Sequence, residues 1–162
     1  TGHKAAFFIP ADGTVLNEDL LRQIIGRGHT VGFTLLSSAQ DMSGKLRAAN
    51  DMLFHATGTV SRLLSISNGS EHLSVVQRDG LTQAGYRIWD TTVDSRDHSY
   101  DASKAGQIIM TALAQTSNPT VIRMGHYKSS ARTTALVATD LDTYNIPVGE
   151  ISLTRTPINH LP

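Results

Sequence analysis

Strand-like apolar runs alternate along this chain with segments of helical periodicity, and this alternation constrains the fold more than any other feature. Six runs rich in β-branched and aromatic residues predict strands: KAAFFIP, HTVGFTLL, VSRLLSI, YRIWDTTV, TVIRMG and PVGEISL. Helices that join neighbouring strands by short turns must cover the sheet, which favours right-handed crossovers and mainly parallel strands. The sequence therefore predicts an α/β fold with alternating strands and helices.

The segments between the strand candidates predict five helices. Four of them follow a residue whose side chain commonly accepts hydrogen bonds from the free N–H groups of a first helical turn. These expected capping residues are Asn17, Ser43, Ser70 and Asp101. The fifth helix carries Ala135, Leu136, Ala138 and Leu141 and is expected to end before Asn145. Because no linker or repeat divides the pattern, we predict a single domain over residues 1–162.

Charge and composition exclude several classes of protein. Lys+Arg and Asp+Glu both number 14, so the chain lacks the basic surface of a nucleic-acid or membrane-surface binder. No run approaches the roughly 18 apolar residues of a membrane span, and we expect neither a span nor a signal peptide in this chain. The absence of cysteine excludes disulfides and thiolate zinc sites. An apolar run begins almost at residue 1, so we expect a fragment of a longer protein.

Common catalytic and cofactor motifs are absent. Gly26, Gly28 and Gly32 do not fit the spacing of a dinucleotide-binding loop, and they end a predicted helix where that motif must begin one. The sequence contains no G-x-S-x-G, no phosphate-binding loop and no H-E-x-x-H. Any function must therefore be sought in the residues that follow the predicted strands, where α/β folds bind their ligands.

Polar residues stand at several of these strand ends. They include Thr34, Ser38, Ser65, Asp94, Asp97, His98 and His126. Carboxylate and imidazole groups suit zinc, manganese or iron, so the last four are candidate metal ligands. A simpler interpretation, which we favour, is that Asp94 and Asp97 cap the turn into the next helix and that the histidines are ordinary surface residues.

The order of these segments resembles the polysaccharide deacetylases with a NodB-like domain, carbohydrate esterase family four. AAFFIP is similar to the family's strand ATFFV, and GHTVGFTLLSS is similar to its G-H-x-I-G-N-H-T-x-x-H. TGTVSRLLSISNG corresponds to T-G-x-x-P-x-x-F-R-P-P-Y-G, WDTTVDSRDH to W-D-x-x-x-D-x-x-D-W, and VIRMGH to an apolar strand ending L-L-H-D. The resemblance spans nearly the whole chain and implies a mainly parallel, truncated (β/α)7-type deformed barrel.

The residues that carry the family's chemistry have changed in this chain. Members bind a divalent metal such as zinc through an aspartate and two histidines, and a second aspartate activates the metal-bound water. The resemblance places both aspartates in a T-F-D-D motif upstream of residue 1, and it places Thr34 and Ser38 at the histidine positions. Other replaced positions hold Ser65 for arginine, His98 for tryptophan, Gly125 for the catalytic histidine and His126 for aspartate. We therefore expect no metal and no cofactor.

The resemblance implies a catalytically inactive deacetylase-like domain of a secreted or cell-surface bacterial protein. Its role would be structural, or it would bind a neighbouring domain or a glycan of the peptidoglycan or chitin type. We expect a degenerate cleft formed by Thr34, Ser38, Ser65, Asp94, Asp97, His98 and His126. Trp89, Tyr100 and Tyr127 are placed to stack on a sugar, although Trp89 is expected in the core.

Three alternatives remain open at this point. One is an active metal-dependent N-deacetylase of chitin or peptidoglycan with atypical site residues. A second is a relocated metal site at His29, His98 and His126, which is disfavoured because His29 precedes its strand instead of following it. The third is an assembly module that forms an oligomer through a sheet edge left open where the family's first strand is missing.

Overall fold

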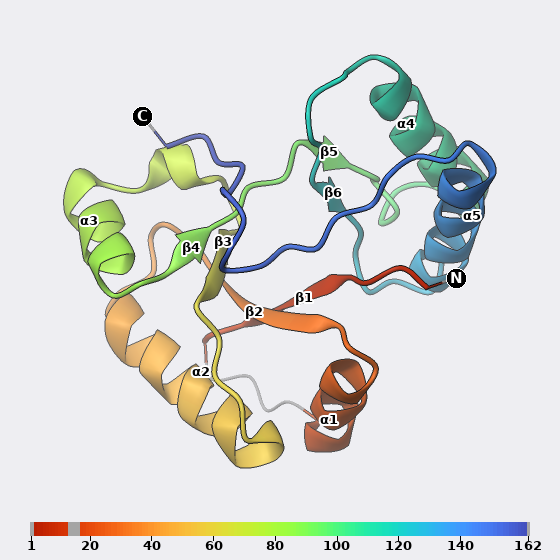
Figure 1. Cartoon of the computed structure of the whole chain (residues 1–162). Helices are drawn as coiled ribbons and strands as arrows, with labels where there is room; N and C mark the ends of the chain where they lie inside the picture. Colours follow the sequence, from red (N-terminus) through yellow and green to blue (C-terminus); the bar gives the residue numbers. More distant parts are fainter. Residues whose placement is uncertain (1, 13–16, 162) are drawn as a thin grey trace. The chain divides into compact units, whose positions relative to one another are not determined.

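Strands and helices alternate from Ala6 to Thr143 in the computed structural model, which describes residues 2–12 and 17–161 (Figure 1). The chain forms two units, which we name after their main elements. The sheet unit comprises Lys4–Asp90 and Glu150–Pro162, and the helix-pair unit comprises Thr1–His3 and Thr91–Gly149. The predicted α/β class and the mainly parallel strands are confirmed, because every strand pair is parallel within the described residues.

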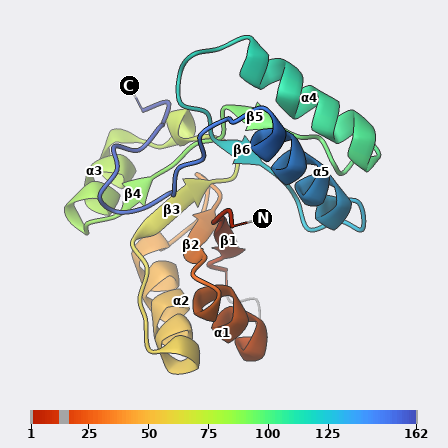
Figure 2. The same ribbon diagram turned by 45° about the vertical axis from the view of Figure 1, so that its right-hand side comes forward.

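The sheet unit contains a parallel sheet in the order β1-β2-β3-β4. Its strands are β1(Ala6–Pro10), β2(Thr30–Leu35), β3(Leu63–Ile66) and β4(Arg87–Ile88). Its helices are α1(Glu18–Gly26), α2(Met42–Thr57) and α3(Val75–Gln83), with a short 3₁₀ helix η1(Ser70–His72). Helices α1 and α2 lie side by side (Figure 2). The central strands are buried. Phe33 and Leu64, which lie side by side on β2 and β3, are both 0% exposed.

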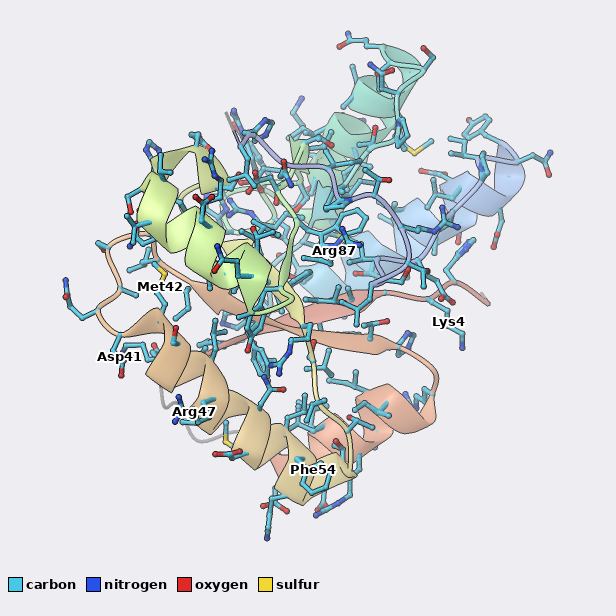
Figure 3. All side chains as sticks on the ribbon, turned by 60° about the vertical axis from the view of Figure 1, so that its left-hand side comes forward. Lys4, Asp41, Met42, Arg47, Phe54 and Arg87 are labelled. Carbon is cyan, nitrogen blue, oxygen red and sulfur yellow. The ribbon has the colours of Figure 1, made fainter. Side chains whose placement is uncertain are left out.

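The helix starts in the sheet unit agree only partly with the prediction. Asn17 caps α1 as expected, because its Oδ1 accepts a hydrogen bond from the Leu20 N–H at 3.1 Å. The prediction that Ser43 caps the second helix is wrong. Asp41 caps α2 instead, accepting from the Gly44 N–H at 3.0 Å, and Met42 begins the helix because its side chain is buried. Figure 3 shows Asp41 and Met42 at this end of α2.

The predicted cap Ser70 is also wrong. Helix α3 begins later, after Ser74, whose hydroxyl and backbone N–H exchange hydrogen bonds with Gln77 in a capping box. Ser70 is completely buried in η1, where its backbone N–H and its hydroxyl both donate to the carboxylate of Asp90. The same carboxylate accepts the backbone N–H of His160 at 2.7 Å, so it also holds the C-terminal segment against the sheet unit.

The helix-pair unit contains two short parallel strands and two helices. These are β5(Val93–Asp94), α4(Ala102–Ala114), β6(Ile122–Arg123) and α5(Ser130–Thr143). Asp101 caps α4 as predicted, accepting from the Lys104 N–H at 2.9 Å. Helices α4 and α5 pack against one another through buried residues that include Ile109 and Val137. None of the helices in the described residues is long and apolar enough to cross a membrane.

Two strand predictions need correction. YRIWDTTV forms two strands instead of one, β4 and β5, because the chain leaves the sheet at Asp90, whose N–H donates to the carbonyl of Ile158 at 2.8 Å. PVGEISL forms no strand within the described residues. Pro147 has no N–H to donate, and Val148 and Leu153 are exposed, so this segment has no buried face to favour pairing.

Candidate functional site

The carboxyl ends of β2 and β3 carry a network of hydroxyl and amide groups. The hydroxyls of Thr34 and Ser67 share a hydrogen bond of 2.8 Å. The Ser37 N–H donates to Asn68 Oδ1 at 3.0 Å, and Asn68 Nδ2 donates to Ser37 Oγ at 2.8 Å. We call these four residues, Thr34, Ser37, Ser67 and Asn68, the polar edge. Its hydrogen bonds lie at the surface, so water or another polar molecule can exchange with them.

The predicted site residues of the sheet unit are only partly joined to this polar edge. Ser65 lies beside Thr34 in the parallel register of β2 and β3. Ser38 is exposed, and its side chain makes no hydrogen bond with the described residues. Ser37, which directly precedes Ser38, was not among the predicted site residues. Its partner Asn68 lies 31 residues away, and the sequence around a serine does not indicate such a distant partner.

His29 and Trp89 lie where the sequence placed them. His29 precedes β2, at the opposite end of this strand from the polar edge, and its Nδ1 accepts the Ala5 N–H at 3.3 Å. Trp89 is buried in the sheet unit, as expected of a core residue. Neither side chain belongs to the polar edge.

In the helix-pair unit, Asp94 lies beside Arg123 in the register of β5 and β6. The two side chains form an ion pair, and Asp94 Oδ1 also accepts the Arg96 N–H at 2.9 Å. Burial raises the pKa of the Asp94 carboxyl, but the hydrogen bonds from Arg96 and Arg123 and the positive charge of Arg123 outweigh it, so the pKa lies below its usual value. Asp94 therefore caps a local turn, as predicted, and is held ionised.

Asp97 has a different role from the one predicted. It does not cap the turn into α4, since its side chain is 3% exposed and reaches the segment after β6. Its carboxylate accepts the Gly125 N–H at 3.0 and 3.1 Å and the Ser130 hydroxyl at 2.5 Å. Its backbone carbonyl accepts the Ser129 hydroxyl at 2.7 Å. All of these groups donate to Asp97, so the carboxylate is occupied in joining two segments of the chain.

Three exposed rings gather beside this carboxylate. The ring of Tyr127 stacks on His126, with centroids 5.4 Å apart and planes 15° from parallel. His98 contacts the same ring from 6.0 Å at a tilt of 50°. We call His98, His126 and Tyr127 the aromatic stack. Its two histidines are predicted site residues that the structure brings together, and the ring of Tyr127, which is 48% exposed, contacts both of them.

Gly125 lies under the aromatic stack and has no room for a side chain. A Cβ atom at this position would lie 2.2 Å from Cε2 of Tyr127 and 3.2 Å from Oδ1 of Asp97. The Tyr127 ring therefore covers the position at which the family resemblance expects a catalytic histidine. A larger residue could enter only if the ring moved, which would separate Tyr127 from His126.

Comparisons with known proteins agree with the fold described above. No protein-family model and no curated protein sequence matches this chain. The structure is similar to that of a polysaccharide deacetylase from Bacillus cereus, with 20% identity over 97% of this chain and 84% of that one and a TM-score of 0.84. It is also similar to a family 4 carbohydrate esterase from Streptomyces lividans, with 17% identity over 99% and 85% of the two chains and a TM-score of 0.76.

A third similar structure is a mutant of BA3943, which is described as a pseudoenzyme of the CE4 family. It shares 18% identity over 87% of this chain and 53% of that one, with a TM-score of 0.71. The chain therefore has the fold of the polysaccharide deacetylases, and the resemblance stated from the sequence is confirmed for the fold.

The residues present do not fit the divalent metal that this fold carries in active deacetylases. The hydroxyl of Thr34 shares its hydrogen bond with Ser67, and a neutral hydroxyl is a poor substitute for imidazole as a ligand. The carboxylate of Asp97 already accepts hydrogen bonds from Gly125 and Ser130, and Asp94 forms an ion pair with Arg123. In the described part of the chain, no three His, Asp or Glu side chains come close enough together to hold a metal ion.

Proposed function

We propose that this chain is a deacetylase-like domain without hydrolytic activity that binds a glycan through the aromatic stack. The main observation behind this proposal is that the Tyr127 ring fills the space in which a side chain at position 125 would lie. Catalysis on this fold needs a metal, a base and a proton donor to act together, and the positions in this chain that correspond to the family's histidines hold hydroxyls at Thr34 and Ser38 and a glycine at Gly125. The loss thus extends over several separate groups, and no single substitution would reverse it.

The aromatic stack supports the binding role. Exposed aromatic rings offer flat apolar faces to the C–H groups of a sugar ring, and imidazole nitrogens can hydrogen-bond to its hydroxyls. The polar edge of the sheet unit is a separate surface, whose hydroxyl and amide groups are of the kind that bind sugar hydroxyls. The similar structures include a peptidoglycan N-acetylglucosamine deacetylase, which favours an N-acetylated cell-wall glycan as the ligand and an extracellular place of action.

Two measurements test this proposal. Purified protein supplied with zinc is incubated with acetylated chitooligosaccharides and with peptidoglycan, and the released acetate is measured. Binding of the same oligosaccharides is measured by calorimetry for the unsubstituted protein, for Tyr127→Ala and for Tyr100→Ala. Tyr100 was also predicted to stack on a sugar, but it lies outside the aromatic stack: it is exposed in the same unit and makes no ring contact with the described residues, so it is a matched control.

We expect no acetate above the rate without protein, and at least a tenfold weaker binding for Tyr127→Ala, which corresponds to about 1.4 kcal/mol. Tyr100→Ala should bind as tightly as the unsubstituted protein. Zinc-dependent acetate release would show an active N-deacetylase and refute the loss of chemistry. Failure of every oligosaccharide and of peptidoglycan to bind would refute the binding role and leave a structural module.

A further inference from the structure

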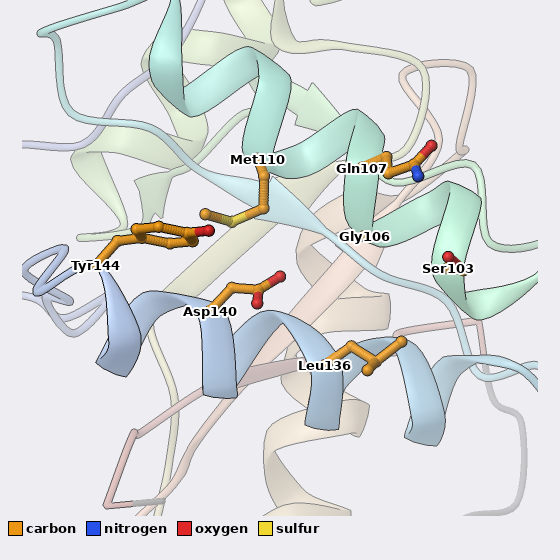
Figure 4. Close-up of a pocket in the computed structure, with 7 residues that line it drawn as sticks. All are labelled: Ser103, Gly106, Gln107, Met110, Leu136, Asp140 and Tyr144. Carbon is orange, nitrogen blue, oxygen red and sulfur yellow. The ribbon is translucent and has the colours of Figure 1, made fainter.

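A groove of about 230 Å³ lies between α4 and α5 in the helix-pair unit (Figure 4). Residues spaced three or four apart form its walls, so each helix presents one row of side chains to it. The row on α4 includes Ser103, Gly106, Gln107 and Met110, and the row on α5 includes Asp140 and ends at Tyr144. These residues take no part in the aromatic stack or the polar edge, so the groove is a separate feature of the surface.

Gly106 is the first indication that the groove is a binding site, because it lines the groove without a side chain to fill it. Glycine in the interior of a helix is less stable than alanine, because it gains nothing from a side chain and loses more backbone entropy. Close packing does not require it here, since a Cβ at Gly106 would meet no atom within 4 Å among the neighbours of α4. The effect of the glycine is to keep the floor of the groove open.

Asp140 is the second indication. It is the only charged residue among the described residues that line the groove. No described residue donates a hydrogen bond to its carboxylate or forms an ion pair with it. Its side chain extends from α5 into the space between the helices (Figure 4). A free carboxylate in a groove favours a positively charged ligand that can donate hydrogen bonds.

The other lining residues narrow the chemistry of this ligand. Met110 and the ring of Tyr144 point toward one another at one end of the groove (Figure 4), and a polarizable thioether and an aromatic face both attract a cation and its apolar stem. Ser103 and Gln107 add a hydroxyl and an amide on α4. Ser103 and Gln107 are exposed, so a lysine side chain would leave them hydrogen-bonded to water, whereas an amino sugar carries hydroxyls beside its ammonium group that can bond to both.

We propose that the groove between α4 and α5 binds a glucosamine unit whose amine is free and protonated. Asp140 accepts hydrogen bonds from the ammonium group, and Tyr144 and Met110 contact the ring beside it. Ser103 and Gln107 are the partners of its hydroxyls. The inference rests on the proposed function only in taking a glycan as the ligand. The site itself is distinct from the aromatic stack and selects the de-N-acetylated form of the sugar.

The test compares two sugar tetramers that differ only in N-acetylation with lysine amide, which carries an ammonium group but no sugar. Glucosamine tetramer, its fully N-acetylated counterpart and lysine amide are titrated into the protein at pH 6 and followed by amide NMR shifts. We expect shifts in α4 and α5 with the glucosamine tetramer, and at least tenfold weaker binding at these helices for the N-acetylated tetramer. Asp140→Asn should weaken binding of the glucosamine tetramer about tenfold, whereas Asp51→Asn, a matched exposed residue of α2, should leave it unchanged.

A second variant blocks the groove without removing a functional group. Gly106→Leu places a side chain into open space, so the protein should keep its melting temperature or raise it while losing the glucosamine tetramer. Unchanged affinity in both Asp140→Asn and Gly106→Leu would overturn the inference, and lysine amide binding as tightly as the tetramer would overturn the assignment to a sugar. Glycan binding that depends on Tyr127 but not on Asp140 would refute the binding site in the groove and leave the proposed glycan binding at the aromatic stack intact.

Discussion

The polar edge and the cluster around Asp97 occupy comparable places, at the carboxyl ends of parallel strands, but they are built differently. At the polar edge, Thr34, Ser67 and Asn68 exchange hydrogen bonds at the surface, and water can replace each partner. Around Asp97, a buried carboxylate accepts hydrogen bonds from two other residues, Gly125 and Ser130, and an aromatic ring lies over the adjacent backbone. One region is open and adaptable, whereas the other is closed and structural.

This difference shows two ways in which side chains can be arranged after a strand. Small polar residues can leave the surface accessible, as at Thr34. Alternatively, a neighbouring side chain can fill the space, as Tyr127 does over Gly125. Substitutions in the first arrangement should cost little stability, whereas those in the second disturb the local packing.

The largest expected effect is on Asp97. Asp97→Ala leaves the Gly125 N–H and the Ser130 hydroxyl without their buried acceptor, so we expect a loss of about 3 kcal/mol in the free energy of unfolding. Urea unfolding followed by circular dichroism measures it. Asn68→Ala removes exposed hydrogen bonds of the polar edge and should cost at most about 1 kcal/mol. Equal losses for the two variants would contradict the distinction between a closed and an open region.

An intermediate effect is expected at Gly125. Gly125→His forces the Tyr127 ring away from its place on His126, so we expect a loss of about 1 kcal/mol, the magnitude of an aromatic stacking contact. In a double-mutant cycle, Gly125→His combined with Tyr127→Ala should cost less than the sum of the two single variants. Strictly additive losses would show that the ring does not compete with a side chain at this position.

The smallest effect concerns the ion pair of Asp94 and Arg123. The pKa of Asp94 is lowered in the folded protein, so the pair stabilises the fold above the ordinary pKa of 3.8, and this contribution disappears as the pH falls through the lowered value. The pair is largely exposed, so Arg123→Gln should cost no more than about 0.5 kcal/mol at pH 7. Thermal unfolding of Arg123→Gln and of the unsubstituted protein at pH 7 and pH 2 measures the difference in stability, which should be smaller at the lower pH. A difference of equal size at both values would assign the effect to packing instead of charge.

Much of the fold could be predicted because it depends on neighbours in the sequence. The caps Asn17 and Asp101 bond to N–H groups three residues away, and such local geometry can be recognised without the rest of the chain. The prediction was wrong for Ser43, Ser70 and PVGEISL. Ser70 bonds to Asp90, twenty residues away, and this long-range contact outweighs its local tendency to cap a helix.

The candidate site was predicted less completely for the same reason. Pattern comparison indicated Thr34, Asp97, His98 and His126 as positions of interest, and the structure joins the two histidines through Tyr127. The partners of Asp97 could not be predicted, because Gly125 and Ser130 follow it by 28 and 33 residues. Which side chain occupies a given space depends on how distant segments pack, and no local pattern records that.

The sequence by itself determined the alternation of strands and helices and the parallel class of the sheet. These properties follow from hydrophobic periodicity and capping chemistry, both of which are local. Only the tertiary structure decided that Tyr127 covers Gly125, that Asp97 joins two segments, and that Gly106 and Asp140 meet in one groove. Each of these depends on contacts between residues far apart in the chain, whose geometry is set by packing the whole unit.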